Sequence, residues 1–166
     1  MIQVGADVNV RRLIVEVQRL AETFAHHPLL LPIQLFQEHS DTTSRKLREI
    51  LKKVKDVETK LMAEIVTQKM NIDLQIAGWN FGELSKTLHT CSMDLVELRR
   101  RRTFEDAVAD ALTSELKNHP LLRRLASSEG LAKRHKRDID SLPERIESQK
   151  TLVRSYYSPY ICRIGI

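Results

Sequence analysis

The sequence has little of what disulfide-rich domains and β-sheets require. Its 166 residues include two cysteines, five glycines and five prolines, and aromatic side chains make up 5%. Cys91 falls inside a regular apolar pattern and Cys162 in the last few residues, so they offer no paired framework of the kind found in small secreted domains. No strong alternating run of β-branched residues is present, which argues against a sheet. These scarcities favour an all-α protein in a reducing, intracellular setting.

Long hydrophobic runs are also missing. The most apolar stretch, residues 29–36, is interrupted by Pro32 and Gln34, and it is far shorter than the roughly 20 residues that a membrane span needs. The first residues lack the cationic start, apolar run and small-residue cleavage site of a secretory signal. As written, the chain is therefore expected to be soluble and cytoplasmic.

Helical periodicity is the strongest positive signal. Between residues 80 and 118, apolar side chains recur at alternating spacings of three and four residues, at Phe81, Leu84, Leu88, Cys91, Leu95 and Leu98. This spacing places them along one seam of a helix, as in a coiled coil. Asn80 and Glu83 form a capping pattern at the start. His119-Pro120 is expected to end the helix, because the residue before a proline avoids the α region.

Similar patterns precede this helix. A first helix is predicted from Asp7 or Asn9 to about residue 25. A second seam is formed by Leu47, Ile50, Leu51, Val54, Val57 and Leu61. Residues 32–43 have two interpretations: they belong to a kinked long helix, which we favour, or they end in a short turn at residues 41–44, whose Asp, Thr and Ser side chains compete with helix.

The connections carry the residues that break helices. Residues 71–80, with Gly78, are the predicted reversal between the second helix and the central one. Pro120 can open a last helix, which Gly130 weakens and Pro143 restarts or kinks. The tetrapeptide His-Pro-Leu-Leu occurs at residues 27–30 and again at 119–122. We interpret it as shared helix-break chemistry, because too little around the two copies matches to indicate a duplication.

Together these patterns predict a bundle of four to five long antiparallel helices, with the coiled-coil-like hairpin of residues 44–116 as its spine. The helical domain is expected to span residues 1–153. All three tyrosines fall within residues 154–166, where the heptad-like spacing stops. This atypical tail is therefore expected to be disordered.

Basic residues are the most conspicuous polar feature, and the net charge of +5 favours anionic partners in a general way. A candidate anion-contacting surface comprises Arg99, Arg100, Arg101, Arg123, Arg124, Lys133 and Arg134. The alternative is that these are solvated helix faces, since consecutive residues point all round a helix. No aromatic residues are interleaved to stack bases, so specific nucleic-acid binding is not expected. Arg102 takes the next seam position after Leu98 and is expected to snorkel or to pair with a carboxylate.

Catalytic and metal-binding patterns are weak. His26-His27 and His89 with Cys91 contain ligand atoms, but neither group has a second ligand pair at usable spacing. The acidic residues Glu105, Asp106 and Asp110 are better explained as partners of the arginines before them than as an acid/base cluster. No nucleophile triad, glycine-rich phosphate loop or CxxC motif is present. We therefore predict no enzyme activity, no cofactor and no metal site.

Two stretches carry a family resemblance: LHTCSMDLVELRRRRTFEDAVADAL at residues 88–112 and RDIDSLPERIESQKTLV at residues 137–153. They resemble the helical region before the membrane in fungal CorA-like magnesium-transporter proteins, and the HHPLLLP segment at residues 26–32 is similar to that family too. The resemblance implies a pentameric divalent-cation channel, in which long helices run from a cytosolic funnel into two membrane spans.

The sequence departs from that family after Val153, where it has no span and no Gly-Met-Asn motif. No ion-binding residue carries over. We therefore expect a truncated product or gene model: a non-catalytic helical domain related to the cytosolic part of such transporters, lacking the pore and acting through self-association or a protein partner. In a longer transporter the same chain would be attached to the membrane. The alternative is a stand-alone interaction module whose basic surface binds anionic partners.

Overall fold

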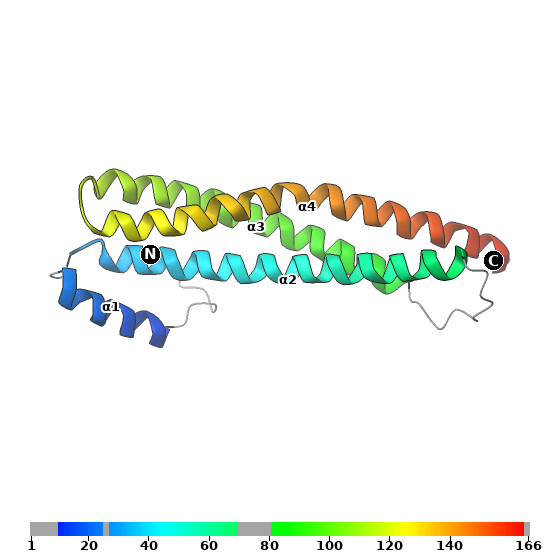
Figure 1. Cartoon of the computed structure of the whole chain (residues 1–166), viewed down its shortest axis with the longest axis horizontal. Coiled ribbons are helices and arrows are strands. Elements are labelled where there is room, and N and C mark those ends of the chain that lie inside the picture. Colours follow the sequence, from blue (N-terminus) through cyan, green and yellow to red (C-terminus); the bar gives the residue numbers. More distant parts are fainter. Residues whose placement is uncertain (1–9, 25–26, 70–80, 165–166) are drawn as a thin grey trace. The chain divides into compact units, whose positions relative to one another are not determined.

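The protein is all-α, as predicted. The computed structural model describes residues 10–24, 27–69 and 81–164. Within them it has four helices and no strand: α1 at Val10–Phe24, α2 at Leu30–Lys69, α3 at Phe81–Glu115 and α4 at Leu121–Ile164 (Figure 1). The predicted reversal at residues 71–80 lies outside the described residues.

The chain divides into two compact units, and each of the three long helices contributes to both. Unit 1 comprises residues 1–47 and 98–138, and unit 2 comprises residues 48–97 and 139–166. Unit 1 therefore contains α1, the start of α2, the end of α3 and the start of α4. Unit 2 contains the remaining lengths of α2, α3 and α4.

Unit 1 has an apolar core built by all four of its helical segments. Its buried members come from α1, α2, α3, the turn after α3, and α4: Leu20, Leu30, Ile33, Phe36, Ala109, Leu112, Leu116, Leu121 and Leu125. Val17 and Ala21 pack against this cluster from α1, so one stripe of that short helix is used for packing. The amphipathic pattern that predicted the first helix therefore has a physical role in anchoring α1 to the core.

Unit 2 buries most members of the two predicted seams, although Leu51 is only partly buried and the side chain of Phe81 lies outside what the structure describes. Ile50, Val54, Val57 and Leu61 are buried on α2, and Leu84, Leu88, Cys91 and Leu95 are buried on α3. The third segment supplies Ile139, Leu142, Ile146, Gln149 and Val153 from α4. Polar contacts join each pair of segments, among them Lys53 to Asp94, Glu58 to Arg145, and Ser92 to Lys150. The three segments of this unit are thus mutual neighbours, and α2 and α3 turn the faces predicted by their apolar spacing inward.

The turn between α3 and α4 is short because its residues suit a helix stop. Asn118 has φ of 66°, the left-handed conformation that asparagine tolerates better than most residues. The His119 amide donates to the Leu116 carbonyl at 2.8 Å, which closes the end of α3. His119-Pro120 then starts the next helix, so the predicted stop at this dipeptide is confirmed.

Two helices are more continuous than their sequences suggest. α2 passes through Asp41, Thr42, Thr43 and Ser44 without a break, so the long-helix interpretation of this region is the correct one. α4 passes through Gly130 and Pro143 as a single helix. The boundary expected at Val153 is not a helix boundary either, because α4 continues to Ile164.

Candidate functional site

The seven predicted anion-contacting residues all lie on α3 and α4 within unit 1. Arg99, Arg100, Arg123, Lys133 and Arg134 are exposed, whereas Arg101 and Arg124 are partly buried. Arg123 and Arg134 stand about 16 Å apart along α4 at 1.5 Å per residue. One small anion therefore cannot contact every member of the set.

Arg102 does not belong to that exposed set. It is 8% exposed and lies in the seam of α3 that begins with Leu84. Its Nη1 donates to Glu105 at 2.8 Å and its Nη2 to Asp106 at 2.6 Å. The prediction that Arg102 pairs with a carboxylate is confirmed, and so is the interpretation of Glu105 and Asp106 as partners of the arginine run.

Glu105 is the centre of a polar layer that crosses the interior of unit 1. Only 1% of the residue is exposed, and its Oε1 accepts hydrogen bonds from Thr43 Oγ1 at 2.6 Å and lies 2.9 Å from His39 Nδ1. Burial by itself would raise the pKa of Glu105. The hydrogen bonds from His39 and Thr43, together with the electrostatic interactions with His39 and Arg102, outweigh it and lower that pKa below its ordinary 4.5. The carboxylate is thus held ionised.

The layer extends beyond Glu105 on both sides of α2. Ser44 Oγ donates to its own helix at the Ser40 carbonyl and lies 3.3 Å from His135 Nδ1 of α4. On the other side, Arg12 of α1 pairs with Glu38 at 3.3 Å and Asp41 at 3.6 Å. The polar run of α2 therefore stays helical, because its side chains contact three other helices and not their own backbone amides.

Sequence reasoning missed His39 and Thr43 as partners of Glu105. A signal was present: a polar run on α2 and a charged pair at seam positions of α3 both interrupt otherwise apolar patterns. Buried polar groups require partners, so two such interruptions on neighbouring helices should be paired with each other. What the sequence lacked was the register between helices that lie about 60 residues apart.

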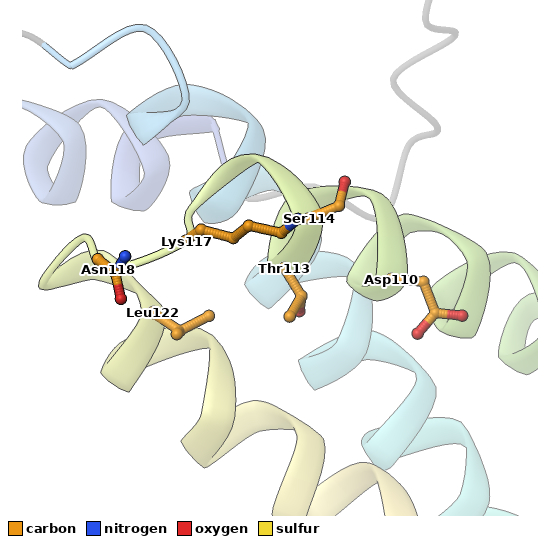
Figure 2. Close-up of a pocket in the computed structure, with 6 residues that line it drawn as sticks. All are labelled: Asp110, Thr113, Ser114, Lys117, Asn118 and Leu122. Carbon is orange, nitrogen blue, oxygen red and sulfur yellow. The ribbon is translucent and has the colours of Figure 1, made fainter.

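One surface hollow lies at the α3–α4 turn and has a volume of about 500 Å³. Figure 2 shows its lining, with the Lys117 side chain extended along α3 towards Ser114 and with Asp110, Thr113, Asn118 and Leu122 around it. Ser114 Oγ donates to the Ala111 carbonyl at 2.7 Å, so its proton is engaged within its own helix. Ser114 is therefore not set up as an activated nucleophile.

Another hollow, of about 260 Å³, lies where α1, α2 and α4 meet in unit 1. Its lining is almost entirely polar and charged: Arg12, Glu16, Gln34, Gln37, Glu38, Asp41 and Arg124. Gln34 is 4% exposed, and its Nε2 is itself closed off from solvent. A molecule in the hollow therefore could not reach that amide nitrogen without movement of the side chain.

The two His-Pro-Leu-Leu segments form matching helix starts that touch each other. The amide of Leu29 donates to His27 Nδ1, and the amide of Leu121 donates to His119 Nδ1, both at 3.2 Å. Each histidine side chain therefore caps the turn that leads into its helix, and each proline lies in that turn, before α2 begins at Leu30 and α4 at Leu121, where its missing N–H costs nothing. The imidazole rings are in contact, with centroids 4.3 Å apart. The shared helix-break chemistry predicted for this tetrapeptide is confirmed.

No group of three or more histidine, cysteine and acidic side chains in residues 10–24, 27–69 and 81–164 is arranged to hold a metal ion. None of the helices, over the lengths that the structure describes, is long and apolar enough to cross a membrane.

Fold and site together define a class: an all-α helical bundle with a polar layer inside one of its units. No protein-family model, no curated protein and no solved structure matches the chain.

Proposed function

We propose that this chain is a non-catalytic helical domain, related to the cytosolic part of CorA-like divalent-cation transporters but without their pore, that acts by packing its helices against itself or a partner. The proposal rests on the contacts that the Glu105 carboxylate makes. Its carboxylate takes contacts from His39, Thr43 and Arg102 and is held ionised, so it joins helices and is unsuited to donating a proton. The resemblance of residues 88–112 and 137–153 supports the relation to the transporters.

Exposed apolar side chains support a role in packing. Met93 and Val96 lie three residues apart on α3, which places them on one helix face, and they are 60% and 46% exposed. Both belong to unit 2. If helices of several copies associate as in a pentameric funnel, this pair would be buried between copies.

Sedimentation velocity over a range of protein concentrations, with and without Mg²⁺, tests the proposal. We expect a concentration-dependent species near five times the chain mass of 19.2 kDa. The double substitution M93S/V96S should shift it towards the monomer. The matched control is Met62→Ser, which changes a side chain of 58% exposure on α2 and should leave association unchanged. A chain that stays monomeric under all conditions would overturn the relation to a pentameric funnel.

The second candidate, a basic module for anionic partners, is favoured by one observation. Arg99 and Arg100 on α3, with Lys133 and Arg134 on α4, are exposed in the same unit. We expect retention on a heparin column that weakens with salt, because exposed charges are screened. R99Q/R100Q should reduce retention more than K52Q/K55Q, which removes the same charge from exposed positions of α2. Equal loss in both variants would show a net-charge effect and exclude a specific surface.

A further inference from the structure

The hollow where α1, α2 and α4 meet in unit 1, called the polar hollow below, is lined by oxygen-bearing side chains of α2. Its volume is about 260 Å³, and its lining includes Gln34, Glu38 and Asp41. These residues are four and three positions apart, so they lie on one face of α2. At about 30 Å³ per water molecule, the space corresponds to roughly nine waters. It is therefore large enough for a small organic molecule.

The amide of Gln34 has hydrogen-bonding capacity that the protein leaves unused. Only 4% of the residue is exposed, and its Nε2 is closed off from solvent without an acceptor. In the described part of the chain no other group hydrogen-bonds to this side chain. Because Nε2 cannot be reached, the carbonyl oxygen Oε1 is the polar atom that Gln34 offers to the polar hollow. Buried polar groups are normally paired, so this oxygen favours a hydrogen-bond donor that comes from outside the chain.

Glu38 adds a buried carboxylate one helical turn from Gln34. The residue is 8% exposed, and its Oε1 pairs with Arg12 Nε at 3.3 Å. Asp41 pairs through Oδ2 with Arg12 Nη2 at 3.6 Å. Each carboxylate thus uses one oxygen on Arg12. Since a carboxylate has about four acceptor positions, both retain acceptors for a ligand.

The charges around the polar hollow favour a cation over an anion. The lining carries three carboxylates and two guanidinium groups, hence a net charge of −1: Glu16, Glu38, Asp41, Arg12 and Arg124. Arg12 is shared by two of the carboxylates, and Glu16 pairs with Arg19, whose exposed charge is screened by water. The carboxylates are not a metal centre, because the described residues contain no group of three or more acidic, histidine or cysteine side chains placed to hold an ion. An organic cation with its own hydrogen-bond donors suits this lining.

We propose that the polar hollow binds a small primary amine, whose ammonium group donates to Gln34 Oε1 and to the carboxylates of Glu38 and Asp41. An ammonium group has three N–H donors and no acceptor, which matches three oxygen-bearing side chains on one helix face. Its charge offsets the net charge of the lining, and hydrogen bonds between ionised groups are stronger than neutral ones. This inference is independent of the proposed function, because it concerns a small ligand of unit 1 and not the association of copies.

A nuclear magnetic resonance titration tests the site with n-butylammonium chloride as the probe, at constant ionic strength. The readout is the side-chain amide signal of Gln34, which its loss in Gln34→Leu assigns. We expect a saturable shift of this signal. Tetramethylammonium has the same charge but no N–H donor, so it should bind at least about tenfold more weakly. Absence of a saturable shift with n-butylammonium, or equal binding of tetramethylammonium, would overturn the proposal. Tighter binding of succinate would also overturn it, since the site would then select anions.

Variants place the binding in the polar hollow. Glu38→Gln removes the buried charge and keeps the side-chain shape, so n-butylammonium should bind at least about tenfold more weakly. The matched control Glu22→Gln removes the same charge from an exposed position of α1 outside the lining and should bind as the wild type does. Equal weakening in both variants would show a net-charge effect and refute the site.

A second variant keeps the test decisive if Glu38→Gln does not fold. Gln34→Leu removes the oxygen acceptor and leaves no unpaired amide in the interior, so we expect it to fold. Binding of n-butylammonium to this variant, followed on the backbone amide of Glu38, should also be weaker than in the wild type. Unchanged affinity in Gln34→Leu would show that the ammonium group does not contact Gln34 and would refute the proposed site.

Discussion

Removing the Glu105 carboxylate should destabilise the protein more than any other single change in the polar layer. In Glu105→Ala, Arg102 stays in the interior with one remaining carboxylate, Asp106, whose side chain is 48% exposed. Thr43, which is fully buried, loses its acceptor. Breaking a buried charge pair by deleting one partner costs about 3–5 kcal/mol. We expect a loss of this size in the free energy of unfolding, measured by urea denaturation at neutral pH.

Two further variants, a conservative replacement of Glu105 and an apolar replacement of Glu105 with its partners, separate the effect of charge on stability from the effect of packing. Glu105→Gln keeps an acceptor for Thr43 but removes the charge opposite Arg102, so its cost should be smaller, about 1–3 kcal/mol. The triple variant T43V/R102M/E105L replaces the two buried donors, Thr43 and Arg102, and their acceptor together by apolar groups of similar shape, while His39, whose side chain is 30% exposed, can be hydrated instead. Such replacements are often nearly neutral, so this variant should recover most of the stability that Glu105→Ala loses.

The stability that Glu105 contributes should also decrease as the pH falls. Because its pKa is lower in the folded protein than the ordinary 4.5, the unfolded state binds the proton first as the pH falls. The contribution is therefore complete above about pH 4.5 and is lost as the pH falls through the folded-state pKa. The stability difference between the wild type and Glu105→Gln should shrink over this range. A loss below about 1 kcal/mol in Glu105→Ala, or a pH-independent difference, would refute the reasoning.

Three further outcomes are expected. Gly130→Ala should raise the free energy of unfolding by about 0.5–1 kcal/mol in a urea titration, because alanine favours helix and a Cβ there meets nothing within 4 Å; a destabilised variant would contradict this placement inside α4. Arg145→Ala should cost less than about 1 kcal/mol, with the loss reduced at high salt, because the side chains of its two-pronged pair with Glu58 are 40% and 25% exposed. In a C162S background, Cys91 should react with a thiol reagent only as fast as the protein unfolds, since burial raises the pKa of its thiol, and rapid labelling of the folded protein would show that the α3 seam opens locally.

Several features of the fold could be predicted because they depend on residues close together in the chain. The spacing of Leu84, Leu88, Cys91 and Leu95 specifies which face of α3 is buried, whatever packs against it. His119-Pro120 stops one helix and starts the next through its own backbone and ring atoms.

The polar run of α2 shows where sequence reasoning alone was insufficient. Asp41, Thr42, Thr43 and Ser44 have side chains that favour turns and caps in isolation. They stay in a helix here because the tertiary structure supplies partners for them, among them Arg12 for Asp41 and Glu105 for Thr43. Local propensity was overridden by contacts that no local pattern contains.

By itself, then, the sequence determined the class of fold, the buried faces of its long helices and the dipeptide at which α3 gives way to α4, since each of these follows from periodicity or from local backbone chemistry. Only the tertiary structure decided that His39 and Thr43 meet Glu105 across 66 and 62 residues. It alone also brought His27 into contact with His119. The physical reason is the same in both cases: helix register between distant segments is set by how whole side-chain layers pack, and a single sequence shows the layers but not their alignment.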